Sequence, residues 1–154
     1  MDTEDVPGVA QLATLRDPEG AIFGLWKPET MPGAETMEGV GALWWIEVLS
    51  NQPARTREFY ESLFGWTSIE KSFEPFATYT FFERGSVHEG GLLPIGEGWD
   101  VTPRWNSIFS VEDTDATVRR ARTLGGREEF VHTVPSAGRI GSIFDSGGAG
   151  RRAA

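Results

Sequence analysis

An approximate internal repeat constrains the fold of this chain more than any other feature of its sequence. When Pro7–Ala21 (PGVAQLATLRDPEGA) is shifted by 128 positions, it falls on Pro135–Ala149 (PSAGRIGSIFDSGGA). The match pairs proline with proline at the start, and Asp, Gly and Ala with their counterparts near the end. Both copies have the pattern of a strand followed by a tight turn; chance similarity of two glycine-rich hairpins is the alternative. Such a repeat indicates that one structural unit is used more than once.

The two copies differ on the C-terminal side of the turn. Ala21–Pro28 (AIFGLWKP) comes after the first turn and is typical of a strand that is apolar on both faces. After the second turn only Gly150–Ala154 (GRRAA) remains, so a final strand is missing from its expected place. We expect Ala21–Trp26 to dock in that place, either within its own chain or exchanged into a second copy to form a homodimer.

Between the two copies lie an exposed linker and the body of one domain. The linker is expected at residues 27–41, which mix proline, glycine and glutamate without an apolar period. The domain is expected at 42–149. An N-terminal hairpin at 1–26 precedes the linker, and a short tail at 150–154 follows the domain.

Within the domain, the apolar periodicity predicts the order strand, helix, strands, repeated twice. The first set is expected at 43–50 (strand), 53–65 (helix ended by Gly65), and 67–71, 77–83 and 90–95 (strands). The second set is expected at 105–113 (strand), 114–126 (helix capped by Asp113 or Thr114), and 128–134 and 139–145 (strands). The first helix should bury the side that carries Phe59, Tyr60, Leu63 and Phe64, and the second should turn Val118, Ala121 and Leu124 inward.

Composition and charge exclude several classes of function. The chain of 154 residues, 39% of them hydrophobic, is long enough for one domain with a sizeable core. Its net charge of -9 repels phosphate backbones and anionic membranes, so nucleic acid is not an expected partner. It contains no cysteine, which excludes disulfides and thiolate chemistry. The longest apolar run, Ala42–Ile46, is too short to cross a membrane, and we expect a soluble, cytoplasmic protein.

Three motifs carry a family resemblance: WIEVLSNQPARTREFYESLFGW (45–66), WNSIFSVEDTDATVRRARTLGG (105–126) and GRIGSIFDSGGA (138–149). They resemble the vicinal oxygen chelate superfamily of glyoxalases, bleomycin-resistance proteins and extradiol dioxygenases, in particular its tandem-module branch. The resemblance covers most of residues 40–149. It implies an α+β fold of paired βαβββ modules whose strands curve into an open barrel around a ligand cavity. The N-terminal hairpin then resembles the end of a preceding module.

The positions that hold a metal ion in metal-dependent relatives can be located through this resemblance. Those relatives use His and Glu, which suit first-row divalent metals and leave room for a substrate. The first-strand ligand position falls at Trp45, fourteen residues before Phe59. The position that opens the second half falls at Asn106, seven residues before Asp113. Tryptophan cannot coordinate a metal, and an asparagine amide is a poor substitute for imidazole.

The two remaining ligand positions are no more convincing. The resemblance places the middle one near Gly91 or Leu92, and the last one near Gly24 if Ala21–Pro28 substitutes for the missing strand. His88 and His132 match none of the positions and are expected to be surface or hydrogen-bonded residues. The sequence therefore predicts neither a metal ion nor another cofactor.

Glu47 is the one candidate catalytic residue. It has the same strand parity as Trp45, and the resemblance places that face toward the cavity. A carboxylate there could act as a base or hold a cation, and burial would raise its pKa unless a positive partner is near; pairing with an arginine for structural reasons is the alternative. We expect Trp45, Glu47 and Asn106 to share one concave, ligand-binding surface. The chain's tryptophans also suit an aromatic pocket, although large apolar side chains commonly fill cores.

Three functions remain open. The first is a metal-free module that binds a small organic molecule, which the intact scaffold and the unsuitable ligand positions favour. The second is a lyase- or oxygenase-type enzyme that uses a divalent metal or Glu47 as a base. The third is an interaction or scaffold unit, which a cavity filled by side chains would favour. The sequence does not identify the ligand.

Overall fold

The computed structural model describes residues 3–33, 36, 38–73, 77–135, 137–145 and 147. The N-terminal segment forms β1 (Thr3–Val6), β2 (Ala10–Arg16) and β3 (Ile22–Pro28). The first half of the domain forms β4 (Leu43–Ser50), α1 (Pro53–Phe64), β5 (Thr67–Phe73), β6 (Ala77–Arg84) and β7 (Val87–Pro94). The second half forms β8 (Arg104–Phe109), α2 (Thr114–Thr123), β9 (Arg127–Val134) and β10 (Gly138–Phe144).

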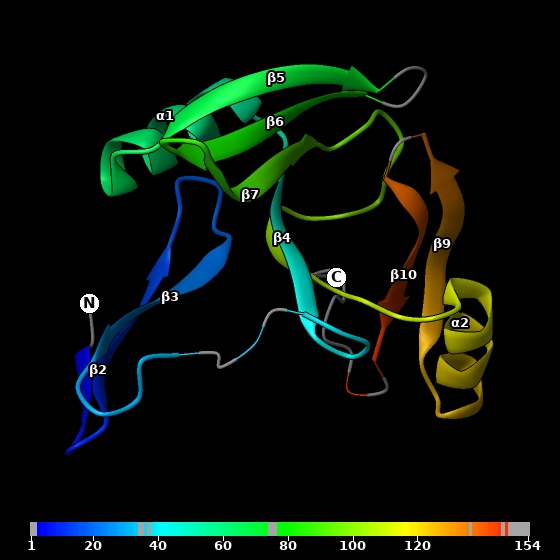
Figure 1. Cartoon of the computed structure of the whole chain (residues 1–154). Helices are drawn as coiled ribbons and strands as arrows, with labels where there is room; N and C mark the ends of the chain where they lie inside the picture. The colour runs from blue at the N-terminus through cyan, green and yellow to red at the C-terminus, as the bar shows by residue number, and fades with distance from the viewer. Residues whose placement is uncertain are drawn as a thin grey trace.

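The strands form three sheets, and β4 joins the two halves of the domain. The largest sheet has the order β5-β6-β7-β4-β8, in which β4 is parallel to β7 and antiparallel to β8. The other sheets are β1-β2-β3 and β10-β9. Helix α1 packs against the large sheet and α2 packs against β9 and β10 (Figure 1). The predicted α+β class and repeated order of elements are confirmed, and the curved sheets stay open rather than closing into a barrel.

Local sequence signals set the ends of both helices. Pro53 begins α1, where its missing N–H is not needed, and Gly65 ends the helix in the left-handed conformation with φ 67°. Asp113 precedes α2 and accepts a hydrogen bond from the N–H of Ala116 at 2.8 Å, so it is the N-cap. The prediction that Leu124 points inward on α2 is wrong, because the helix ends at Thr123 and Leu124 is 70% exposed.

The core lies between α1 and the face of the large sheet that it covers. Val48, Tyr60, Phe82 and Leu92 are all fully buried there, and Ala21 from the N-terminal segment belongs to the same cluster. These residues come from different elements of the first half, so the first module carries the main core. On α1, Tyr60 is buried as expected, whereas the predicted inward residues Leu63 and Phe64 are partly exposed.

The N-terminal hairpin packs against α1 and not in the place of a final strand. Strand β3 pairs with β2 along its length, and Phe23 makes edge-to-face ring contacts with Phe59 and Tyr60. In the turn, Asp17 is only 6% exposed and accepts a hydrogen bond from the Tyr60 hydroxyl at 3.1 Å. We expected Ala21–Trp26 to dock in the place of a final strand, and within its own chain this expectation is wrong. The hairpin packs against α1 instead.

Glu19 fixes the same turn to the start of α1. Its carboxylate accepts hydrogen bonds from the N–H of Asn51 at 3.0 Å and from the Thr56 hydroxyl at 2.8 Å, and it also bonds the Ser50 hydroxyl. Gln52, the N-cap residue of α1, makes no side-chain capping bond. The hairpin thus supplies a negative charge at the helix N-terminus, where it interacts favourably with the helix dipole.

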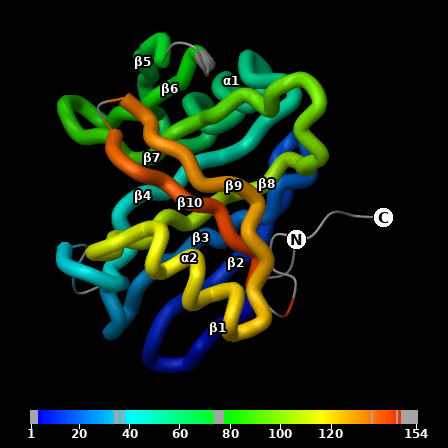
Figure 2. The backbone as a smooth tube through the Cα atoms, turned by 90° about the vertical axis from the view of Figure 1, so that its right-hand side faces the viewer, coloured from blue at the N-terminus to red at the C-terminus, as the bar shows by residue number. Residues whose placement is uncertain are grey.

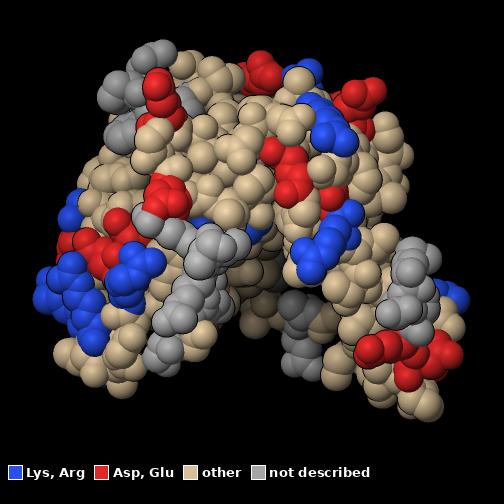
Figure 3. Space-filling model, turned by 180° about the vertical axis from the view of Figure 1, so that it is seen from behind, with Lys and Arg blue, Asp and Glu red and all other residues tan. Residues whose placement is uncertain are grey.

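The surface and the helices bear on the predicted partners. Acidic and basic side chains are interspersed on the face shown in Figure 3. Arg119, Arg120 and Arg122 form a basic cluster on α2, where Arg122 forms an ion pair with Glu128. Among the described residues, neither helix is long and apolar enough to span a membrane.

Candidate functional site

Glu47 lies on the face of β4 that points away from α1. Its neighbour Val48 is buried in the α1 core, so the alternation of the strand turns Glu47 to the opposite, concave face. Two cavities open on that face, and Glu47 and Asn106 line both of them. The larger cavity, about 530 Å³, lies between β8 and β10, and the smaller one is about 310 Å³.

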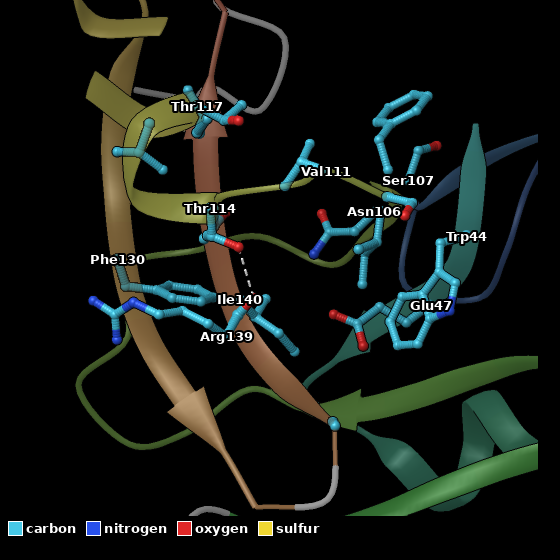
Figure 4. A pocket seen from close by; sticks show the side chains of 18 of the residues that line it. Trp44, Glu47, Asn106, Ser107, Val111, Thr114, Thr117, Phe130, Arg139 and Ile140 are labelled. Carbon is cyan, nitrogen blue, oxygen red and sulfur yellow. Dashed lines mark hydrogen bonds between the residues drawn. The ribbon is translucent and has the colours of Figure 1, made fainter. Parts of the chain in front are cut away.

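Figure 4 shows the two sides of the larger cavity. Trp44, Glu47 and Asn106 come from β4 and β8 on one side, and Phe130 and Ile140 come from β9 and β10 on the other. The walls therefore combine a carboxylate and an amide with aromatic and aliphatic surface, as is usual for sites that bind small molecules.

Hydrogen bonds hold the Glu47 carboxylate in place. The Tyr79 hydroxyl donates to Glu47 Oε2 at 2.9 Å and accepts a hydrogen bond from Trp45 Nε1 at 2.8 Å. Asn106 also bonds the Glu47 carboxylate through its side chain. Because Arg104 Nε donates to Asn106 Oδ1 at 2.9 Å, the Asn106 amino group is the one that faces Glu47.

The network continues into the second half of the domain. Arg104 Nη2 lies 3.2 Å from Glu129 Oε2, and that oxygen accepts a hydrogen bond from the Ser142 hydroxyl at 2.7 Å. Arg104 therefore links the amide that holds Glu47 to a carboxylate on β9 and a hydroxyl on β10. One chain of polar contacts connects both walls of the larger cavity.

Burial shifts the proton equilibria of this network. It raises the pKa of Glu47, and the hydrogen bonds from Tyr79 and Asn106 together with the charge of Arg104 only partly offset it. Burial is also the largest cause of a raised pKa at Tyr79, reinforced by the negative charge of Glu47. Tyr79 therefore remains a protonated donor, while Glu47 holds its proton more tightly than an exposed glutamate does.

The residues at the metal positions of related proteins do not fit a metal ion. A Cβ atom at Gly91 would lie 1.8 Å from the Tyr79 hydroxyl oxygen, so the phenol fills the space that a ligand side chain would need. Leu92 is fully buried in the α1 core and faces away from the cavities. Among the described residues, no group of three or more His, Cys, Asp or Glu side chains could hold a metal. Gly24 lies in the N-terminal sheet.

The two histidines lie outside the Glu47 network. His88, on β7, packs against Phe81 and Trp45, and its Nδ1 lies 3.2 Å from Glu83. His132, on β9, stacks on Phe130. His88 is exposed, in agreement with the expected surface position, and His132 is half-buried.

The structure places two of the three predicted site residues on the concave surface. Glu47 and Asn106 line both cavities, whereas Trp45 reaches the site through Tyr79 and lines neither. Trp44 lines the larger cavity in its place. The expected aromatic pocket is divided, because Trp66 packs with Phe82 in the core on the other side of the sheet.

The sequence did not single out Tyr79, Arg104, Glu129 or Ser142. Tyr79 and Phe81 are two residues apart in a predicted strand and share one of its faces, but this pattern does not identify the partner of Tyr79. Its contact with Glu47 depends on the register of β6, β7 and β4, which a single sequence does not reveal.

Comparison with known proteins identifies related sequences. Residues 42–150 match the model of a family described as Glyoxalase/Bleomycin resistance protein/Dioxygenase superfamily. The anthracycline biosynthesis proteins DnrV of Streptomyces peucetius and DauV of a Streptomyces strain are each 33% identical over 97% of this chain. The glyoxylase-like protein CFP32 of Mycobacterium bovis is 30% identical over 97% of the chain. The chain spans about half the length of these relatives: 54% of the first two and 57% of the third.

Proposed function

Because the chain belongs to the Glyoxalase/Bleomycin resistance protein/Dioxygenase superfamily, we propose that its concave face binds a small organic molecule without a metal ion. The observation that carries this proposal is the Glu47 carboxylate, held by Tyr79 and Asn106 in the wall of both cavities. A carboxylate that the protein itself positions can orient a ligand without a metal ion.

The walls suggest the chemistry of the ligand. Glu47 suits a hydrogen-bond donor or a cation, and Trp44, Phe130 and Phe144 offer apolar and aromatic surface. Two relatives are named for anthracycline biosynthesis, which makes a planar aromatic molecule the first ligand to test. The cavities, of about 530 and 310 Å³, speak against a purely structural unit whose cavity is filled by side chains.

The experiment is a calorimetric titration of the EDTA-treated protein with an anthracycline as the probe. We expect binding by the wild type and an affinity at least about tenfold lower for Glu47→Gln, which corresponds to about 1.4 kcal/mol. Glu112→Gln is the matched control, because Glu112 is exposed and lies outside both cavities. Equal affinities for Glu47→Gln and wild type, or binding that requires an added divalent metal, would contradict the proposal.

A second candidate function is an enzyme in which Glu47 acts as a base. The raised pKa of Glu47 favours it, because a base accepts protons best when its pKa approaches the working pH. Deuterium uptake from D2O into a bound ligand, followed by NMR, tests this function. Deuterium uptake by the wild type that is lost in Glu47→Gln would support the enzyme function. Binding of the ligand without deuterium uptake would contradict the enzyme function and leave only the binding function.

The proposal also covers the cellular location of the protein and the partners that it does not bind. We propose that it acts in the cytoplasm and that neither nucleic acid nor a membrane is its partner, as the net charge of -9 suggests. Cell fractionation with antibody detection tests the location. Titration with a DNA duplex and with anionic vesicles at low salt tests the two excluded partners.

A further inference from the structure

Trp99 is an exposed tryptophan in the wall of the smaller cavity. It lies in the connection between β7 and β8 and is 47% exposed. The other apolar residues that line this cavity are buried or half-buried: Leu49, Leu93, Val101, Phe130 and Phe144. An aromatic surface that stays open beside a cavity is suited to contact with a ligand.

A tight turn holds the Trp99 indole in place. The turn runs from Gly96 to Trp99 and is closed by a hydrogen bond from the Trp99 N–H to the Gly96 carbonyl at 3.1 Å. Gly98, its third residue, has φ 78°, a conformation that favours glycine. A Cβ at Gly96 would lie 3.0 Å from Cε2 and Nε1 of Trp99, so the indole lies directly against the bare backbone there. Just before the turn, the N–H of Ile95 donates to the Ser50 carbonyl at 2.8 Å, which ties the turn to the end of β4.

The two other aromatic rings that line the smaller cavity each have a neighbour on one face. The guanidinium carbon of Arg127 lies 4.1 Å from the centroid of the Phe144 ring. Phe130 stacks on His132, with ring centroids 4.7 Å apart. Such a neighbour occupies a face that a flat ligand would need. Trp99 is therefore the most open aromatic ring of this cavity.

The two cavities adjoin at the residues proposed to hold the ligand. Glu47 and Asn106 line both cavities, as do Phe130 and Phe144. Figure 2 shows β9 and β10 in front of β4 and β8, so the strands that carry these residues face each other across the site. A ligand whose donor group is bound at Glu47 can therefore extend into the smaller cavity, of about 310 Å³, toward Trp99.

We propose that Trp99 selects planar aromatic ligands: a flat ring system stacks on its indole in the smaller cavity, while a donor group of the same molecule reaches Glu47 and Asn106. This inference rests on the proposed binding function and adds the residue that distinguishes a flat ligand from a bulky one. Indole attracts both flat rings and cationic groups. Because the turn already holds the indole, stacking on it requires little ordering of the protein.

Two amines of different shape test the proposal by calorimetric titration. Proflavine is a flat system of fused rings with amino groups, whereas adamantylamine carries its amino group on a saturated cage without a flat face. We expect Trp99→Leu to weaken proflavine binding by about fivefold or more and adamantylamine binding by less than about twofold, because leucine keeps an apolar surface but cannot stack. Trp99→Phe, which keeps a ring, should restore most of the affinity for proflavine.

Trp26→Leu is the matched control. Trp26 is also exposed, at 40%, and its indole N–H bonds the Met31 carbonyl. It lines neither of the two cavities on the concave face, so its substitution should leave the affinities for both amines unchanged.

Fluorine NMR adds a measurement that a general loss of stability does not reproduce. With fluorotryptophan in place of the six tryptophans, the signal that is missing from Trp99→Leu reports on Trp99. Proflavine should shift this signal more than the signal of Trp26, because the ring current of a stacked ring acts at short range.

Several outcomes would overturn the role of Trp99. They are a wild type that does not bind proflavine, a Trp99→Leu variant that binds it as the wild type does, equal losses for the two amines, and a Trp99 signal that proflavine does not move. Glu47→Gln, titrated with the same probe, separates this inference from the proposed function. A loss of affinity in Glu47→Gln alone would contradict the role of Trp99 and support the proposed function. A loss in Trp99→Leu alone would support the role of Trp99 and contradict a binding function centred on Glu47.

Discussion

At the scale of single residues, the site is built around one hydrogen-bonded carboxyl group, that of Glu47. The phenol of Tyr79 fills the space beside Gly91 and donates to Glu47, which Asn106 also holds. A carboxylate in this position needs no cation to be oriented, because its donors come from the neighbouring strands. Burial removes water from the Glu47 carboxylate and disfavours its charged form, which raises the pKa of Glu47.

The pH dependence of stability should therefore carry the signature of Glu47. Because the folded state binds this proton more tightly than the unfolded chain, the unfolding free energy falls as the pH rises from the ordinary glutamate pKa through the raised one. This loss of unfolding free energy is about 1.4 kcal/mol for each unit by which the pKa is raised, and Glu47→Gln should abolish it. Urea unfolding of both proteins between pH 4 and 8 measures it. A wild type that gains stability over Glu47→Gln as the pH rises would contradict the assignment.

A second prediction tests whether the Tyr79 phenol fills the space that a side chain at position 91 would need. Gly91→Ala should destabilise the protein by about 1–3 kcal/mol, because its Cβ overlaps the phenol. In a Tyr79→Ala background the same substitution should cost less than about 0.5 kcal/mol, a coupling that a double-mutant cycle isolates. Gly24→Ala is the control, since its Cβ would meet nothing closer than 3.6 Å. Equal costs of Gly91→Ala in both backgrounds would count against the overlap.

At the scale of elements, the N-terminal hairpin holds the start of α1 in place. The helix has no side-chain cap of its own, and Glu19 of the hairpin accepts hydrogen bonds at its first turn. Asp17 adds a buried bond with Tyr60, near the centre of the core. The stability of the first helix thus depends on a segment that lies outside residues 42–150, the part of the chain that matches the family.

This dependence predicts unequal effects for two glutamates of the hairpin region. Glu19→Ala should lower the unfolding free energy by about 1–3 kcal/mol, because it leaves the Asn51 N–H and the Ser50 and Thr56 hydroxyls without their acceptor. Glu29→Ala should change it by less than about 0.5 kcal/mol, since Glu29 is exposed. Urea unfolding measures both, and equal losses would show that the carboxylate of Glu19 does not stabilise the start of the helix.

The sequence predicted the elements better than their mutual arrangement. The apolar run at Leu43–Ser50 located a strand, and Gly65 marked the end of α1, because both signals are local. Strand β1 (TEDV) was not predicted, because it has no apolar alternation and is held by its ladder with β2. The seat of the hairpin on α1 was also missed, since the contact between Asp17 and Tyr60 joins residues 43 positions apart.

At the scale of the whole molecule, the main core depends on two distant segments of the chain. Ala21 is 1% exposed within the core cluster, and Phe23 packs against that cluster from the hairpin. The linker residues that the structure describes between Pro28 and Leu43 are mostly exposed, so they connect the two parts without holding them together. The hairpin thus contributes to the main core although it lies outside the domain expected from the sequence.

Removal of residues 1–30 should therefore destabilise the domain strongly. The deletion exposes the surface that Phe23 covers, worth about 1.5–3 kcal/mol, and removes the bonds of Asp17 and Glu19. At about 2–4 °C for each kcal/mol, the melting temperature should fall by several degrees or more, or the protein should aggregate. A peptide of residues 1–30, added in excess, should restore part of the loss. Deletion of residues 1–6 alone is the control, because β1 is exposed and contributes nothing to the core cluster. A longer deletion that melts at the wild-type temperature would show that the hairpin does not support the core.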